Sequence, residues 1–344
     1  MMETTLVCDR SGQRALRRKR RAFTLIELLA ALAVIGVLLA LLAPAIMAAR
    51  ESNRRLTCAN HLHQLGQALH NYHSQYTVLP FGVGADRDPT VAGPGGIDDR
   101  RYSAHSQLLP FLDQTPLYRR IDFNVAPFHP YFNALKGPNG EMPVNGAAAA
   151  TRVAVFLCPT DLESTQAPWG QNNYRTNNGS TWNGRSGNGP FGQNSSVRLE
   201  GILDGTSQTA MLSERCKGRW SAEVNLRDDL VNRANLWTEA TFRSWCGQLT
   251  PTQAAALPRD PEGGQTWLEG NFNWTRYNHL LNPNFPSCKN GITWSGVALS
   301  ASSRHPTGVN TLYCDGSVRF VSENIDRLVW SGTGSINGNE VISP

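Results

Sequence analysis

The chain has 344 residues and a formal net charge of +5 at pH 7, a length that allows one large soluble domain or two small ones. The first 22 residues hold seven Lys/Arg against two Asp/Glu, and the remainder carries 25 of each. Nucleic-acid binding needs a concentrated basic face, so this charge distribution argues against a nucleic-acid-binding protein.

The first predicted element is an apolar helix. Residues 28–49 are 22 consecutive uncharged residues, and a helix of that length spans roughly 33 Å, enough for a bilayer core of about 30 Å. A secretory signal peptide would have a shorter apolar core with its cleavage site after that core. The basic residues before the helix predict a cytoplasmic N-terminus. We therefore expect residues 23–49 to cross the inner (cytoplasmic) membrane once and the body to be periplasmic or otherwise extracytoplasmic.

An acidic residue stands at the entrance of this helix, where a charge is costly and a partner is expected. Residues 22–28 read Ala-Phe-Thr-Leu-Ile-Glu-Leu and resemble the prepilin processing motif of type IV pilins and type II secretion pseudopilins. The resemblance implies that a prepilin peptidase removes leader residues 1–22 by cutting between Ala22 and Phe23 and methylates the new amine. It also implies that Phe23 and Glu27 are assembly residues, with Glu27 pairing with a neighbouring subunit's N-terminus. The family usually has Gly where Ala22 stands.

Pro44 is expected to kink the helix, because proline interrupts backbone hydrogen bonding. Residues 50–78 are predicted to continue it as an amphipathic helix that stops before Pro80. Its apolar stripe has steps of four and three residues and should pack on the globular domain; it consists of Cys58, Leu62, Leu65, Leu69, Tyr72 and Tyr76.

Histidines on this helix invite a metal interpretation: His61, His63, His70 and His73. Only the last two are helical neighbours, so two ligands at most could converge, and we predict neither a metal site nor a cofactor.

Cys8 lies in the leader, which leaves six cysteines: Cys58, Cys158, Cys216, Cys246, Cys288 and Cys314. An even set in an oxidising compartment favours disulfides, although six cysteines allow 15 pairings and the sequence does not choose among them. Residues 153–157 form an apolar run typical of a buried strand, and Cys158 follows it. Our hypothesis is a Cys58–Cys158 disulfide that fastens the helix to the sheet.

Residues 79–344 are predicted to form the extracytoplasmic domain. Gly, Pro, Ala and Asn between residues 82 and 150 predict long loops. The Asn-, Gln- and Gly-rich residues 171–196 predict irregular surface structure; the alternative is that these amides and Trp182 bind glycan.

Asp315-Gly316 is the strongest hairpin signal in the chain. We interpret it as a type I′ turn, which places Tyr313 opposite Val318. Asp204 and Asp315 are also considered as calcium ligands, but neither has enough nearby oxygens.

Several motifs in order resemble the DUF1559 family, pilin-like proteins abundant in planctomycete bacteria: Phe-Leu-Cys-Pro at 156–159, Leu-Asp-Gly-Thr-Ser at 203–207, Arg-His-Pro at 304–306 and Asp-Gly-Ser-Val-Arg-Phe at 315–320. The similarity covers residues 21–328. It implies an α+β, pilin-like fold with a long N-terminal helix packed on an antiparallel β-sheet and long irregular loops. It implies little about mechanism, because the family's role is not established.

We expect a structural subunit rather than an enzyme, since no known catalytic motif occurs and a triad of Ser302, His305 and Asp315 is the best that can be drawn. The expected product is a type IV pilus-like or type II secretion filament, at the cell surface after assembly. The expected partners are a prepilin peptidase/N-methyltransferase, other pilin-like subunits, an inner-membrane assembly platform and membrane lipid. The alternative is a membrane-anchored binding protein, for example for polysaccharide, that does not polymerise.

Overall fold

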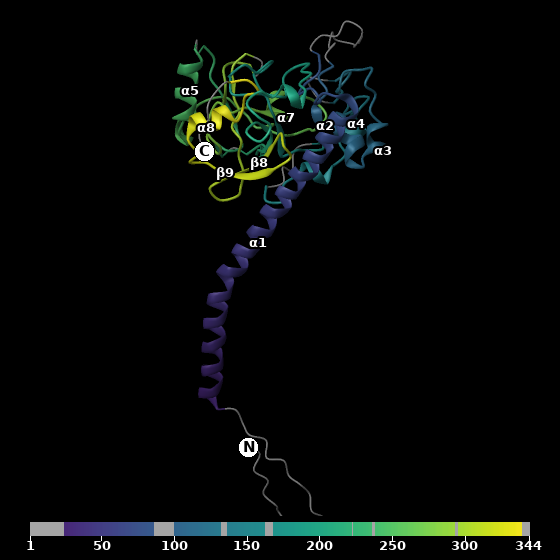
Figure 1. Cartoon of the computed structure of the whole chain (residues 1–344). Coiled ribbons are helices and arrows are strands. Elements are labelled where there is room, and N and C mark those ends of the chain that lie inside the picture. The colour runs from purple at the N-terminus through teal and green to yellow at the C-terminus, as the bar shows by residue number, and fades with distance from the viewer. Residues whose placement is uncertain are drawn as a thin grey trace, which may run out of the picture. The chain divides into compact units, whose positions relative to one another are not determined.

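The computed structural model describes residues 24–85, 100–131, 136–161, 168–221, 223–235, 238–292 and 295–338. The chain divides into an N-terminal unit, residues 1–52, and a C-terminal unit, residues 53–344. One helix, α1 (Leu25–Tyr76), contributes residues to both units (Figure 1).

In the N-terminal unit, α1 is apolar on every side. Its large hydrophobic side chains between Leu25 and Met47 are exposed, as at Val37 (61%) and Leu41 (69%). This part of the helix is long and apolar enough to cross a membrane by length and composition. A helix that is hydrophobic all round belongs in apolar surroundings. Pro44 lies inside α1, which continues through it, so the proline does not end the helix and the kink stays a prediction.

The C-terminal unit contains two sheets. The five-stranded sheet has the order β5-β1-β2-β8-β9 and the four-stranded sheet the order β4-β3-β6-β7. Their bounds are β1 Tyr174–Asn177, β2 Ala210–Glu214, β3 Leu230–Asn232, β4 Arg259–Asp260, β5 Arg276–Tyr277, β6 Ser287–Lys289, β7 Val297–Ala298, β8 Gly308–Tyr313 and β9 Val318–Ser322.

The sheets are mixed rather than antiparallel, which corrects the prediction. Strand β1 pairs with β5 in parallel, and β3 pairs with β6 in parallel. Parallel neighbours need a long crossover connection, and residues 178–275 and 233–286 supply such connections.

Short helices surround the sheets: α2 Ala104–Leu108, α3 Thr115–Tyr118, α4 Gly146–Ala149, α5 Glu239–Gly247, α6 Pro251–Ala255, α7 Phe272–Thr275 and α8 Arg327–Gly332, with 3₁₀ turns η1 Leu109–Leu112, η2 Ala154–Phe156 and η3 Leu199–Gly201. In Figure 1, α2, α3 and α4 lie on the opposite side of this unit from α5 and α8. The strand predicted over residues 153–157 is wrong, because η2 occupies that run and Phe156 N donates to Val153 O at 3.1 Å.

The main core forms where α1 meets the five-stranded sheet. The stripe residues Cys58, Leu62, Leu65 and Leu69 are fully buried, whereas the last one, Tyr76, is 50% exposed. Gly66 lets the helix approach β8, because a Cβ there would stand 2.9 Å from Leu312 Cδ1, closer than carbon atoms pack. The helix and the β8–β9 hairpin therefore share one core.

The β8–β9 hairpin forms at the predicted place in the chain, but its strands pair in a different register from the predicted one. Leu312, rather than Tyr313, lies opposite Val318. The loop has three residues, since Tyr313 N donates to Ser317 O at 2.8 Å.

A bonded carboxylate explains this longer loop. Asp315 Oδ1 accepts hydrogen bonds from Ser317 N (2.9 Å) and Ser317 Oγ (2.7 Å). Of the two predicted turn residues, Gly316 alone has positive φ, at 85°, and a three-residue loop ending in a left-handed residue is a common hairpin connection. Leu312, at this register position, faces α1 beside Gly66.

The amide-rich residues 172–179 are buried, which corrects the expected surface structure for this stretch, whereas most of residues 180–188 are partly or fully exposed. All four residues of β1 are buried, and Asn177 Nδ2 donates to Ala210 O (2.8 Å) and Gly334 O (2.9 Å). Trp182 packs against Phe242 with ring centroids 5.7 Å apart. These amides therefore satisfy backbone carbonyls inside the domain, as buried polar groups require.

Candidate functional site

The predicted processing and assembly residues lie at the start of α1. Ala22 and Phe23 fall outside the described residues. Thr24 and Glu27 form reciprocal bonds: Thr24 N donates to Glu27 Oε2 at 2.9 Å, and Glu27 N donates to Thr24 Oγ1 at 3.3 Å. This arrangement is a capping box, which satisfies backbone donors that the first helical turn leaves unpaired.

Glu27 therefore has a local partner that the sequence analysis missed. The spacing Thr-x-x-Glu just before an apolar run is the sequence signal for a capping box. The Thr24 hydroxyl also donates to Glu27 Oε2, at 2.8 Å, and both side chains are exposed. An exposed, capped carboxylate remains accessible to a group from another molecule, so the two roles are compatible.

The structure joins Cys58 of α1 to Cys158, the pair of our hypothesis, with Cα atoms 5.1 Å apart. Two further buried groups face this bridge. His305 Nε2 lies 3.7 Å from Cys158 Sγ and 3.4 Å from Glu214 Oε1. Carboxylate, imidazole and sulfur atoms thus meet at one buried point where α1, β2 and the segment before β8 converge.

Of the remaining cysteines, Cys246 pairs with Cys288, which fastens α5 to β6. Cys216 and Cys314 are free and buried, so the even set that favoured disulfides forms two bridges and leaves these two thiols unbridged. Burial raises the pKa of the Cys216 thiol, and the nearby Asp161 carboxylate raises it further. Because the thiolate is the nucleophile, a thiol held in its protonated form is unreactive.

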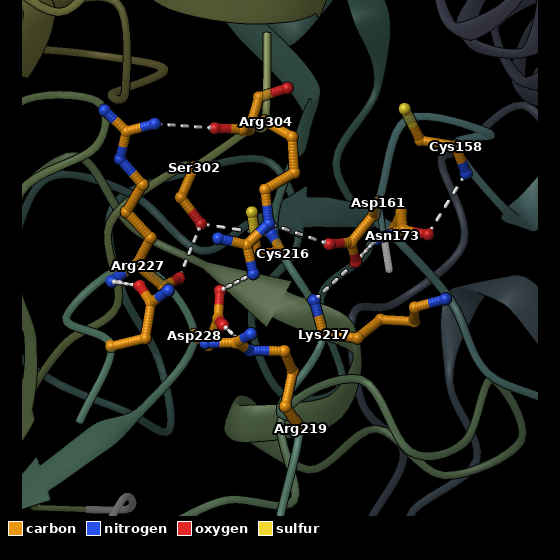
Figure 2. Close-up of polar contacts among 12 residues, drawn as sticks. Cys158, Asp161, Asn173, Cys216, Lys217, Arg219, Arg227, Asp228, Ser302 and Arg304 are labelled. Atoms are coloured by element: carbon orange, nitrogen blue, oxygen red, sulfur yellow. Dashed lines mark hydrogen bonds and ion pairs between the residues drawn. The ribbon is translucent and has the colours of Figure 1, made fainter. Parts of the chain in front are cut away.

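A network of charges surrounds Cys216, shown in Figure 2. Arg304 bridges two buried carboxylates, with Nε 3.3 Å from Asp161 Oδ1 and Nη2 bonded to Asp228 Oδ1. Arg219 Nε donates to the other oxygen of Asp228 at 2.7 Å. Two carboxylates and two guanidiniums compensate one another, as buried charges must.

This network also positions the bridge region. Asp161 Oδ2 accepts from Lys217 N (2.8 Å) and from Asn173 Nδ2 (2.7 Å), and Asn173 Oδ1 in turn accepts from Cys158 N at 3.1 Å (Figure 2). The loop that carries Cys158 is thereby tied to the segment after β2.

The residues considered as a catalytic triad have other partners. Ser302 Oγ donates to Arg227 O at 2.9 Å, and Asp315 is bonded within its own turn. His305 Nε2 faces Glu214 and Cys158. The contacts of Ser302 and His305 tie separate segments of the domain together, whereas that of Asp315 is local to its turn.

The other residues considered as ligands also have structural contacts. His61 Nδ1 lies 2.9 Å from Leu157 O, and His73 Nε2 accepts from Leu199 N at 3.2 Å. Asp204 Oδ2 accepts from Ser335 Oγ and from Gly338 N, both at 2.7 Å. His61, His73 and Asp204 thus connect separate segments of the domain.

A pocket of about 530 Å³ lies at the end of α1, within the usual size range of small-ligand sites. Tyr72 donates from its hydroxyl to Gln107 Oε1 in its wall, at 3.1 Å. Half of its described lining residues are aromatic, namely Tyr72, Tyr76, Phe81, Tyr102, Tyr118 and Phe123, and Arg100, Gln107 and Asn194 are polar.

Comparison with protein families gives two matches. Residues 47–328 match the model of DUF1559, a protein of unknown function, which covers more than half of the chain. The chain belongs to the DUF1559 family. Residues 17–43 of this DUF1559 protein match the prokaryotic N-terminal methylation motif, which includes Ala22, Phe23 and Glu27. No curated protein and no solved structure matches the chain.

The methylation motif and the apolar helix together mark this DUF1559 protein as a prepilin-like processed chain. Its N-terminal helix is suited to anchor it in a membrane, with the family domain outside.

Proposed function

We propose that this DUF1559 protein is a non-enzymatic, pilin-like subunit. A prepilin peptidase cuts it between Ala22 and Phe23, and it then assembles through Phe23 and Glu27 into a type IV pilus-like or type II secretion filament. Before assembly it is held in the inner membrane by α1, with the N-terminus in the cytoplasm and the domain outside. Its partners are the peptidase, other pilin-like subunits and an assembly platform.

The observation that carries this proposal is the methylation motif at the start of a helix whose residues 28–49 are uncharged and whose entrance bears a carboxylate. An anchor needs no charge there, since a carboxylate at membrane depth costs about 2.5 to 3.5 kcal/mol at the helix centre and less at the boundary. A cationic amine from a neighbouring subunit's processed N-terminus would offset this cost. The capping box keeps Glu27 at the first turn, beside the new terminus.

The capping role must be separated from the assembly role, and the chain offers matched variants for this. Glu27→Gln removes the charge but keeps a capping box, because Gln also serves at that position. Thr24→Ala removes the cap and keeps the charge, at a cost of about 0.5 to 2 kcal/mol to the helix. Crosslinked oligomers and surface-sheared material would be compared between both variants and wild type.

We expect Glu27→Gln to suppress oligomers and Thr24→Ala to retain them. Leaving one member of a buried ion pair without its partner typically costs about 3 to 5 kcal/mol, a factor of more than 100 in an association constant. N-terminal mass spectrometry should show all three chains cleaved before Phe23. Equal oligomer yields from Glu27→Gln and wild type would contradict the proposal.

The second candidate is an anchored, non-polymerising binding protein, and the aromatic pocket favours it. Aromatic faces with a few polar groups suit a carbohydrate or another ring-shaped ligand. The pocket replaces the Trp182 region as the place where such binding would occur. If Tyr76→Ala abolished polysaccharide binding by the anchored chain while Glu27→Gln left its oligomers unchanged, this candidate would lead.

A further inference from the structure

The buried group around the Cys58–Cys158 bridge contains four residues of three types that bind metals. One atom each from Cys58, Cys158, Glu214 and His305 lies within 4.8 Å of every other. All four residues are buried, with exposed fractions between 0% and 5%. Two sulfurs, an imidazole nitrogen and a carboxylate oxygen form a donor set that zinc accepts.

Two of the six ligand-to-ligand distances match those of a tetrahedral centre. With bond lengths of about 2.3 Å to sulfur, 2.05 Å to nitrogen and 2.1 Å to oxygen, a tetrahedron has edges of about 3.6 Å for S···N and about 3.4 Å for N···O. The structure has 3.7 Å between Cys158 Sγ and His305 Nε2, and 3.4 Å between His305 Nε2 and Glu214 Oε1. The sulfur atoms are the pair that must separate, because they are bonded to each other.

The carboxylate is held in place by a second layer of contacts, as in metal sites. Asn310 Nδ2 donates to Glu214 Oε1 at 2.8 Å, and Asn310 N donates to Glu214 Oε2 at 2.7 Å. The backbone N of His305 donates to Ser303 Oγ at 3.1 Å, which holds the segment that carries the imidazole. Such outer contacts fix ligand orientation and commonly change metal affinity by about 10- to 100-fold.

We propose that Cys58, Cys158, Glu214 and His305 form a Zn²⁺ site that is available when the Cys58–Cys158 disulfide is reduced. Oxidised, the two sulfurs bond to each other; reduced, they bind the metal. In either state α1 is fastened to the domain at the same point. The site is independent of whether the chain polymerises.

The redox step needs a reductant, for which a dithiol suffices. The dithiol gives two electrons and two protons to the bridge, its own sulfurs join as a disulfide, and Cys58 and Cys158 become thiols. Zn²⁺ then displaces the two thiol protons to solvent and bonds two thiolates, His305 Nε2 and Glu214 Oε1. Four protein ligands close the coordination shell, which is typical of structural zinc.

The test uses the processed full chain in detergent, with Co²⁺ as a spectroscopic probe and Zn²⁺ as competitor. The protein is reduced with a phosphine, which becomes the phosphine oxide, and is then freed of reductant without oxygen. We expect one Co²⁺ per chain, with thiolate-to-cobalt charge-transfer absorption and tetrahedral d–d bands that Zn²⁺ abolishes. Oxidised protein should show none of these bands.

Two kinds of variant locate the metal. His305→Gln should lower Co²⁺ affinity by about tenfold or more, because removing even an outer contact of a metal ligand typically lowers affinity by about 10- to 100-fold. Cys216→Ser removes a buried thiol outside the group, and a Cys246→Ala/Cys288→Ala double variant removes the other bridge; both should keep the bands.

The proposal would be overturned by absent bands in reduced wild type that keeps its near-ultraviolet circular dichroism. It would also be overturned if His305→Gln, shown to fold when oxidised, bound Co²⁺ as wild type does. Should reduction itself unfold the chain, Zn²⁺ must restore the dichroism, and failure to do so rejects the site. Glu214→Gln serves as the second ligand variant if His305→Gln does not fold.

Discussion

His279 should make the domain lose stability as the pH falls below neutrality. The side chain is fully buried, stacks on Trp330 with ring centroids 3.9 Å apart, and places Nδ1 2.9 Å from Trp330 O. Its Nε2 lies 2.9 Å from the Tyr277 hydroxyl. A neutral ring that donates from Nδ1 and accepts at Nε2 satisfies both contacts. Burial lowers the pKa of His279 from 6.5 to about 3, although the bond to Trp330 opposes this.

The sign and size follow from proton linkage. Because the folded pKa lies below the unfolded one, the unfolded chain binds the proton first, so stability is full above about pH 7 and is lost as the pH falls from about 6.5 toward 3. At about 1.36 kcal/mol per pH unit, the loss between pH 7 and pH 5 is about 2 kcal/mol from this residue.

The assay is denaturant unfolding of the processed chain in detergent at pH 5, 6 and 7, with disulfides intact. His279→Gln keeps a donor and an acceptor but removes the titration. It should lose about 2 kcal/mol less than wild type between pH 7 and pH 5, whatever its stability at pH 7. His63→Gln, at an exposed position, controls for the loss of a histidine. Parallel pH curves for wild type and His279→Gln would refute the reasoning.

Three further substitutions have expected outcomes. Leu312→Ala should cost about 2 to 5 kcal/mol in denaturant unfolding, because Leu312 fills the core beside α1, while Leu328→Ala, at a 65% exposed site, should cost under about 0.5 kcal/mol. Gly316→Ala should cost about 1 to 2 kcal/mol by the same assay, because φ is 85°; Gly201→Ala, with open space and no positive φ, is its control. Ala22→Gly should be processed at least as completely as wild type, measured by N-terminal mass spectrometry.

The long helix and its bridge could be predicted because their signals are local or periodic. The apolar run and the three- and four-residue steps around Leu62 and Leu65 require only helical geometry. Cys58 falls on the apolar stripe of the helix, and Cys158 directly follows the apolar residues 153–157. Both cysteines are therefore expected in the same core, where they can bond. The apolar residues 153–157 contain a 3₁₀ turn rather than the predicted strand. A short apolar segment can be buried in a helical turn or in a strand, so its hydrophobicity does not distinguish the two.

The hairpin register and the interior amides could not be predicted, because they depend on contacts that the pattern does not encode. An Asp-Gly pair fits hairpin loops of either two or three residues. The hydrogen bond that Ser317 N donates to Asp315 Oδ1 favours the three-residue loop. Asn177 donates to carbonyl groups that are 33 and 157 positions away in the sequence. Local composition predicts a surface position for such an amide, because it contains no information about these distant partners.

The buried four-residue group was missed for the same reason. The metal interpretation considered histidines on one helix, where spacing alone can be judged. Glu214 and His305 lie on separate segments of the domain. Their ligand atoms lie within 4.8 Å of the sulfur atoms of the Cys58–Cys158 disulfide. Ligands brought together by tertiary structure leave no spacing motif in the sequence.

The position of the bridge connects the two proposals. Cys58 lies near the start of the C-terminal unit, ahead of the buried Leu62, Leu65 and Leu69 along α1. Force applied to the anchor of an assembled subunit would travel along α1 and reach Cys58 before it reached those packed residues. A covalent bond there would bear the load and keep the apolar stripe from peeling off the sheet. A zinc centre at the same point would also bear load but could be exchanged, so the redox state would set how firmly the domain is held to its helix.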